Sequence, residues 1–254
     1  MADQAQAAAH WDAAYAQGDD THSWFEKHPD MSLRMLGSAG ISAADALIDV
    51  GGGASPLTRV LLDRGFRDLT VLDISAAGMQ HARYRLGSRA DQVHWLTADV
   101  LSWHPQRHYR AWHDRAVYHF LTTDEHRQQY LHTLDTATDM GAIAVFGCFA
   151  PDGPQHCSGL PVARYSPAQL ARQLGTKWLL TSQVREEHIT PAPAVLRNPN
   201  VSRLARPRYA DHERRHGAIG RLRNALPAES GAPESCACPL AATCIRPVLS
   251  CDRS

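Results

Sequence analysis

The fold is decided by residues 47–55, which read Leu47-Ile48-Asp49-Val50-Gly51-Gly52-Gly53-Ala54-Ser55. An apolar run ends in an acid, and three consecutive glycines lead into a helix-like segment that extends to Arg64. A short continuous apolar run is typical of a parallel strand, because both faces of such a strand are covered. Glycine lets the backbone turn sharply and approach a ligand closely. Strand, glycine turn and helix together predict a nucleotide-type binding turn.

Strands and helices alternate over the next 140 or so residues of the chain. Apolar strand-like segments lie at 46–50, 69–73, 92–96, 109–117, 142–149 and 178–185. Helical segments lie at 55–64, 76–87, 124–136 and 167–174, two of them preceded by capping sites at Thr122-Thr123 and Ser166. The pattern predicts an α/β fold with a doubly wound, mainly parallel, Rossmann-like sheet. We therefore expect an N-terminal segment (1–45), a main domain (46–190) and a tail (191–254).

Three acids lie at the ends of successive strands: Asp49, Asp73 and Asp99. Because the carboxyl ends of parallel strands meet at one edge of a sheet, we expect these acids to surround the glycine turn. An acid at the end of the second strand is well placed to accept hydrogen bonds from a ribose diol, each worth about 1.5–3 kcal/mol with a charged partner. The three acids predict a nucleoside-binding site.

The glycine spacing distinguishes between two kinds of nucleoside ligand. A dinucleotide site needs G-x-G-x-x-G, but the position of its third glycine is taken by Pro56. An acid just before the glycines is also unfavourable beside a pyrophosphate and favourable beside a cation. Asp49 therefore favours S-adenosylmethionine, whose sulfonium and amino groups are positive. A nicotinamide-dependent reductase is the weaker alternative.

Composition argues against several other classes of protein. The chain has 26 basic and 26 acidic residues, so no basic field predicts a nucleic-acid partner. No apolar run approaches the roughly 20 residues of a membrane span. The first nine residues lack the basic start and apolar core of a secretory signal, so we expect a cytoplasmic protein with no membrane partner. The six cysteines lack paired C-x-x-C spacing, and we expect no metal site.

The motifs resemble those of class I S-adenosylmethionine-dependent methyltransferases. The resemblance rests on Asp49-x-Gly51-Gly52-Gly53, Val71-Leu72-Asp73-Ile74-Ser75 and Ala98-Asp99-Val100, and it extends from Trp11 to about Pro191. It implies that the glycines hold the methionine part of S-adenosyl-L-methionine, Asp73 the ribose, and Asp99 with Val100 the adenine. Aromatic residues near the N-terminus match a segment that covers the cofactor. The implied cofactor-binding residues are Trp11, Tyr15, Trp24, Asp49, Gly51, Gly52, Gly53, Asp73, Ile74, Asp99 and Val100.

A fourth motif concerns the methyl acceptor. It reads Trp112-His113-Asp114-Arg115-Ala116-Val117-Tyr118-His119-Phe120 and resembles segments of the elongation-factor lysine methyltransferases and the thiopurine methyltransferases. Arg115 and Ala116 replace the lysine and glycine of the lysine-methylating pattern. A lysine acceptor must first lose a proton, which costs about 4.6 kcal/mol at pH 7. Asp114 and His119 are therefore candidate catalytic residues, with packing as the alternative for His119.

The character of the chain changes after Pro191. The tail holds 8 of the 15 prolines, 4 of the 6 cysteines, 10 arginines and 5 acids. A segment so poor in large apolar groups cannot easily offset its ordering entropy, and we expect much of it to be disordered. No part of it reads as the antiparallel strand that normally completes this fold, so the sequence leaves open whether that strand is missing. A shifted reading frame is one hypothesis, and resequencing the coding region tests it.

The function predicted from the sequence is methyl transfer from S-adenosylmethionine to a small molecule or a protein side chain, by in-line displacement. The substrate partner would be that methyl acceptor. The alternative is a non-catalytic cofactor-binding or interaction protein, particularly if the tail has cost the sheet a strand.

Overall fold

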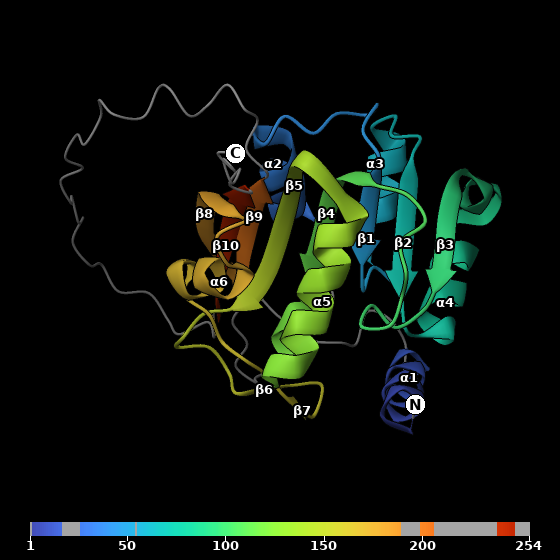
Figure 1. Cartoon of the computed structure of the whole chain (residues 1–254). Coiled ribbons are helices and arrows are strands. Elements are labelled where there is room, and N and C mark those ends of the chain that lie inside the picture. The colour runs from blue at the N-terminus through green and yellow to red at the C-terminus, as the bar shows by residue number, and fades with distance from the viewer. Residues whose placement is uncertain (1, 17–25, 54, 189–198, 206–237, 247–254) are drawn as a thin grey trace, which may run out of the picture.

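A computed structural model describes residues 2–16, 26–53, 55–188, 199–205 and 238–246 (Figure 1). Its centre is five parallel strands in the order β3-β2-β1-β4-β5. These strands are β1 (Leu47–Val50), β2 (Leu69–Asp73), β3 (Val93–Thr97), β4 (Tyr109–Arg115) and β5 (Thr138–Phe149). Every residue of β1 and β2 is buried, as expected for central strands with helices on both faces. The predicted doubly wound α/β fold is confirmed.

Helices cover the sheet on two sides and form two separate cores. They are α1 (Ala2–Tyr15), α2 (Asp30–Ser38), α3 (Leu57–Asp63), α4 (Ala76–Leu86), α5 (Asp124–Ala137) and α6 (Pro167–Leu174), with short 3-10 helices at Gly87–Gln92 and Tyr118–Phe120. One core joins α2, α3 and α4 to the sheet, and the other joins α5 and α6 to it. In Figure 1, α5 crosses the near face of the sheet while α3 and α4 lie behind it. No helix in the described parts of the chain is long and apolar enough to span a membrane.

Polar caps define where several helices begin. Ser75 accepts a hydrogen bond from the Gly78 N–H at the start of α4. Thr123 caps α5, as predicted, by accepting from the His126 N–H. Ser166 and Gln169 form a reciprocal capping box at the start of α6, with Pro167 in its first turn. These caps fix the helix starts that follow β2 and β4, and with them the loops around the sheet edge.

The far edge of the sheet corrects one expectation. The sequence left open whether the antiparallel strand that completes this fold is missing, and no run after Pro191 was interpreted as a strand, but β9 (Pro199–Ala205) and β10 (Cys238–Arg246) lie there beside β8 (Leu179–His188). Both run antiparallel to β5, with Ile245 of β10 opposite Ala144. Backbone groups along the edge of β5 need hydrogen-bond partners whatever the neighbouring side chains are. β9 has few apolar residues, whereas β10 carries a mostly apolar run at 240–245 that was not interpreted as a strand. The disorder expected for the tail is therefore not found at 199–205 and 238–246, and the rest of the tail lies outside the described ranges.

Candidate active site

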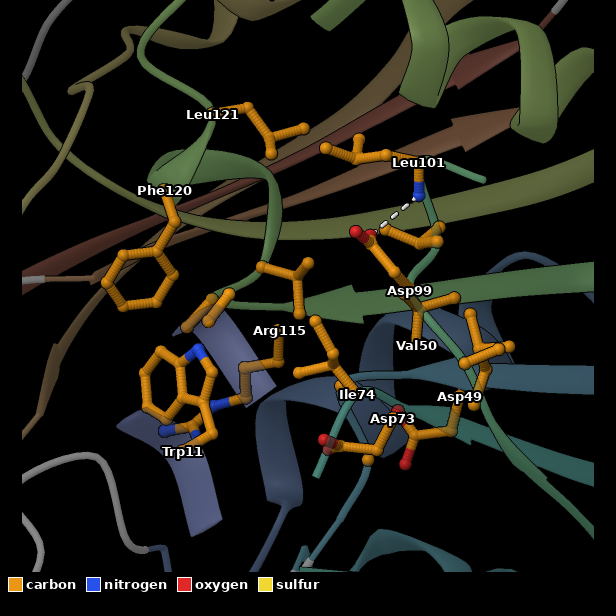
Figure 2. Close-up of a pocket in the computed structure, with 18 of the residues that line it drawn as sticks. Trp11, Asp49, Val50, Asp73, Ile74, Asp99, Leu101, Arg115, Phe120 and Leu121 are labelled. Atoms are coloured by element: carbon orange, nitrogen blue, oxygen red, sulfur yellow. Dashed lines mark hydrogen bonds between the residues drawn. The ribbon is translucent and has the colours of Figure 1, made fainter. Parts of the chain in front are cut away.

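A cavity of about 630 Å³ opens at the carboxyl ends of β1, β2, β3 and β4. Residues of α1 and of the loops after these strands complete its walls. Figure 2 shows its two sides: Asp49, Asp73 and Asp99 lie together, and Trp11 and Phe120 lie across from them. The polar side is formed by the sheet and the other side by aromatic and aliphatic groups.

The three glycines of the turn are required for different reasons. Gly51 has φ +68° and donates its N–H to the Leu72 carbonyl at 2.7 Å, and a Cβ there would collide with Val117. A Cβ on Gly52 would lie 2.6 Å from Asp49 Oδ2. A Cβ on Gly53 would lie 2.6 Å from the Tyr15 hydroxyl oxygen. Gly51 and Gly52 line the cavity, whereas Gly53 supports it from outside the lining.

Asp73 is held by the backbone on two sides. Its Oδ2 accepts the Gly53 N–H at 2.9 Å and its Oδ1 accepts the Ser75 N–H at 2.8 Å. Burial raises the pKa of Asp73 to about 6, against the lowering effect of these N–H donors, and the nearby carboxylates of Asp49 and Asp12 raise it further. A carboxylate has about four acceptor sites, so two bonds leave capacity for a ligand.

Asp49 and Asp99 lie on either side of Asp73 along the sheet edge. Asp49 is 2% exposed, and its Oδ1 lies 2.7 Å from His113 Nδ1, while Oδ2 is buried and has no hydrogen-bond partner among the residues that the structure describes. Asp99 is less buried and accepts the Leu101 N–H at 2.9 Å. All three acids line one cavity, as their positions at the strand ends predicted.

Helix α1 is attached to the start of α4. Asp12 Oδ1 accepts the Ser75 hydroxyl at 2.6 Å and the Ala77 N–H at 3.0 Å. Tyr15 is 5% exposed and packs against Gly78, where a Cβ would lie 2.6 Å from Tyr15 Cε2. Trp11 and Tyr15 both line the cavity, on the side where a cover is expected, and Trp24 lies outside the described residues.

The two candidate catalytic residues are buried and do not line the cavity. Asp114 accepts hydrogen bonds from the Val117 and Tyr118 N–H groups and from the Tyr130 hydroxyl, and burial raises its pKa to about 6. His119 stacks on Phe149 at 4.9 Å, and in the described part of the chain neither ring nitrogen has a hydrogen-bond partner. Burial, and secondarily Arg115, lowers the pKa of His119 to about 3. Asp114 holds the loop after β4 in place, and His119 packs behind Phe120.

The other side of the cavity has an apolar wall, to which α1 and α5 add the polar side chains of Gln4, Gln6, His10, His126 and Gln129. Trp11 meets Phe120 edge to face at 5.0 Å. A small hairpin of β6 (His156–Cys157) and β7 (Leu160–Pro161) brings Cys157 and Leu160 to the wall. Ser158 and Gly159, with φ +50° and +78°, form its two-residue turn, which is the geometry that favours Gly in such hairpins. Arg115 and Glu26 form an ion pair of 3.2 Å at the cavity wall.

Comparison with known proteins gives structural matches only, since the sequence matches no family model and no curated protein. The chain resembles the Burkholderia thailandensis 1,6-didemethyltoxoflavin-N1-methyltransferase with a TM-score of 0.59, at 16% identity, over 80% of this chain and 89% of the other. It resembles the Synechocystis magnesium protoporphyrin IX methyltransferase with a TM-score of 0.54, at 16% identity, over 70% and 77%. A third match concerns disulfide-to-thioacetal conversion during echinomycin biosynthesis, with a TM-score of 0.58, 20% identity, and coverage of 81% and 94%. The fold is that of class I S-adenosylmethionine-dependent methyltransferases.

The methyltransferase fold gives the cavity its usual place, at the carboxyl ends of the parallel strands. The narrower resemblance to the lysine and thiopurine methyltransferase groups receives no support from these comparisons. Four contributors to the site were not assigned a role from the sequence: Asp12, Glu26, Ser32 and His113. Each acts through a partner more than 60 residues away, as in Asp12 to Ser75 and His113 to Asp49, so no local pattern identifies them.

Proposed function

We propose that this chain transfers a methyl group from S-adenosylmethionine to a small, uncharged acceptor. The observation that carries the proposal is the ring of three carboxylates around the glycine turn, with Asp49 Oδ2 buried and without a hydrogen-bond partner in the described structure. A buried acceptor left unsatisfied costs about 1–3 kcal/mol, and more when it is charged. A cationic ligand with N–H donors would recover that cost.

The residues present fit the cofactor in chemistry and in space. Asp49 faces a cation favourably, and Asp73 retains acceptor capacity for ribose hydroxyls. Asp99, with Val100 and Ile74 in the same wall, would hold the adenine end, as the resemblance implies. Gly51 and Gly52 leave the space that a side chain would otherwise fill. When bound, S-adenosylmethionine supplies an electrophilic methyl group, and the chain's own contribution is to align the acceptor with it.

The nature of the acceptor follows from the apolar wall. Trp11, Phe120, Leu121 and Leu160 line this side of the cavity. The charged residues that join them, Arg115 and Glu26, neutralise each other. The acids elsewhere in the cavity disfavour an anionic acceptor. A small, flat, uncharged molecule with a nucleophile that is already deprotonated at neutral pH fits best. The named methyltransferases of the same fold support a small molecule as the acceptor.

Asp114 and His119 take positioning roles in this proposal. Both are fully buried behind the wall, so neither has a path for direct proton transfer to a bound acceptor. An acceptor that needs no deprotonation also needs no general base. His119 supports Phe120 through an edge contact at 4.4 Å. Loss of either residue is expected to act through the shape of the wall.

Calorimetric titration with S-adenosylhomocysteine tests the cofactor site. The wild-type chain should bind it, and Asp73→Asn should weaken binding by tenfold or more, while the exposed Asp91→Asn serves as the matched control. If Asp73→Asn bound S-adenosylhomocysteine as tightly as wild type, the proposed site would be refuted. If the wild-type chain bound NAD⁺ instead of S-adenosylhomocysteine, the nicotinamide-dependent reductase would be favoured. A mass-spectrometric screen for methylated products then identifies the acceptor. Binding without turnover on a broad panel of acceptors would favour the non-catalytic alternative.

A further inference from the structure

Ser32, His113 and Asp49 form a continuous buried line of hydrogen bonds beneath the glycine turn. His113 Nδ1 lies 2.7 Å from Asp49 Oδ1, and His113 Nε2 lies 2.9 Å from Ser32 Oγ. The three side chains come from α2, β4 and β1, and their residues are 1%, 1% and 2% exposed. His113 and Asp49 both line the cavity, and Ser32 lies behind them.

The chemistry of the three groups gives this line a direction. An ionised carboxylate can only accept, so His113 Nδ1 carries the proton that it shares with Asp49. In the neutral ring, Nε2 is then an acceptor and takes the Ser32 hydroxyl proton. A hydrogen bond at one ring nitrogen fixes the role of the other, so Ser32 holds both the tautomer and the orientation of the ring.

This arrangement divides the work between the two oxygens of Asp49. Oδ1 is occupied by His113, whereas Oδ2 is buried and without a partner among the described residues. Oδ2 also fills the space that a Gly52 side chain would take, which puts it directly under the turn. His113 therefore holds Oδ1, and Oδ2 remains as the oxygen beneath the glycines that has no partner among the described residues.

We infer that His113, held by Ser32, is a positioning residue that orients Asp49 to accept from the ammonium group on the methionine part of the cofactor. The inference rests on the proposed function and extends it to residues on α2 and β4. Asp73 ends β2 and Asp99 follows β3, and in the proposed function these two acids hold the adenosine part. The network should therefore affect ligands that carry the amino-acid part and leave adenosine-only ligands unaffected.

A purely architectural role for this network makes a different prediction. Helix α2 is already anchored in the core by Met31, Leu33, Met35 and Leu36, each less than 7% exposed. Removal of the Ser32 hydroxyl should consequently leave the helix docked. If the network only stabilised the fold, its loss would weaken every ligand to the same extent.

Two ligands separate these possibilities by calorimetry on the full chain. S-Adenosylhomocysteine carries the amino-acid part, and 5′-methylthioadenosine carries only the adenosine part. We expect Ser32→Ala to weaken S-adenosylhomocysteine about fivefold and His113→Leu at least tenfold, with 5′-methylthioadenosine affinity within about twofold of wild type. His113→Asn keeps an N–H donor near the position of Nδ1 and should recover most of the loss. Ser38→Ala, on the exposed side of the same helix, is the control.

The possible outcomes of this experiment separate the network from the site as a whole. A selective loss of S-adenosylhomocysteine binding that His113→Asn restores supports the inference. Equal weakening of both ligands, or no change in either, overturns it while leaving the proposed function intact. A wild-type chain that binds neither ligand overturns both. If His113→Leu fails to melt cooperatively, Ser32→Ala and its Ser38→Ala control decide between a positioning role and an architectural role. The measurement is the same ratio of S-adenosylhomocysteine affinity to 5′-methylthioadenosine affinity.

Discussion

The ring of Tyr15 lies against Gly78, so closely that a Cβ at that position would be 2.6 Å from Tyr15 Cε2. Helix α1 can therefore reach the cavity only because α4 has no side chain there. Gly78→Ala should displace α1, lower the melting temperature by a few degrees, and weaken S-adenosylhomocysteine at least fivefold. Gly37→Ala is the matched control, since open space surrounds Gly37 within its helix. It should leave ligand affinity unchanged, and unchanged affinity in Gly78→Ala would contradict a covering role for α1.

The raised pKa of Asp73 predicts how stability changes with pH. The folded chain binds the proton of the Asp73 carboxyl more tightly than the unfolded chain does, because the pKa of Asp73 is about 6 in the folded chain and its ordinary value is 3.8. The contribution of Asp73 to the free energy of unfolding is therefore fully present below pH 4. It amounts to up to about 3 kcal/mol and is lost as the pH rises through 6. Asp73→Asn lacks this titration. In urea titrations, the unfolding free energy of wild type should therefore fall relative to that of Asp73→Asn as the pH rises from 4 to 7.

The same group predicts the opposite trend for ligand binding. A protonated Asp73 has lost acceptor capacity for ribose hydroxyls, so affinity for 5′-methylthioadenosine should fall as the pH is lowered from 7 to 5. Asp73→Asn should bind more weakly and show no inflection near pH 6. Titrations at half-unit pH intervals measure both chains. An inflection that persists in Asp73→Asn would assign the effect to another group of the cavity, which His10, His113 and His126 also line.

The loop after β4 contains a strained residue, since Ala116 has φ +71°. A non-glycine residue in this conformation costs about 1–2 kcal/mol. Ala116→Gly should relieve that strain and raise the unfolding free energy by up to about 1 kcal/mol, after the entropy of the unfolded glycine is subtracted. Ala116→Val should destabilise, because a β-branched residue tolerates positive φ least. Chemical denaturation of the three chains checks the order, and a destabilised Ala116→Gly would refute it.

Tyr130 joins two buried groups beneath the same loop. Its hydroxyl donates to Asp114 and accepts from Trp112 Nε1 at 2.8 Å. Tyr130→Phe leaves the carboxylate short of one donor and the indole N–H without its acceptor, so it should cost about 2–4 kcal/mol of unfolding free energy. Tyr84→Phe is the exposed control. A loss below about 0.5 kcal/mol would show that other groups replace the hydroxyl.

The apolar wall gives a prediction for catalysis. Phe120→Ala should raise the KM for the methyl acceptor about tenfold or more, because it removes the aromatic ring from the wall against which the acceptor is proposed to bind. The affinity for S-adenosylhomocysteine should change by less than threefold. Steady-state kinetics on the acceptor found by mass spectrometry measures the first quantity, and calorimetry the second. Equal loss of both would place Phe120 in the cofactor part of the cavity.

The parts of the site that could be predicted from the sequence are those in which each residue follows directly from its own strand. Asp49, Asp73 and Asp99 follow this rule, since the parallel sheet brings successive strand ends to one edge. Tyr15 could be placed beside Trp11 in the same way, because helical spacing puts both rings on one face.

The remaining parts depend on contacts between distant segments. Nothing in the local sequence connects Asp12 to Ser75 or His113 to Ser32, which the chain brings together only when it folds. His119 illustrates the reverse case. A histidine in such a motif suggests a general base. The stacking of His119 on Phe149 depends on β5 lying next to the loop after β4, which the local sequence does not predict. The strands β9 and β10 are held by pairing with β5 and β8, and only β10 carries a local signal, the mostly apolar residues 240–245.

Ser75 connects the helix that covers the cavity to the carboxylate beneath it. Its backbone N–H donates to Asp73, and its hydroxyl donates to Asp12 of α1. In the proposed function we expect ligand binding and the docking of α1 to be coupled through Ser75, and such a coupling strengthens both to the same degree. In the proposed function, a tightly docked α1 would slow the departure of spent cofactor, so we expect the hydrogen bond between Ser75 and Asp12 to influence turnover.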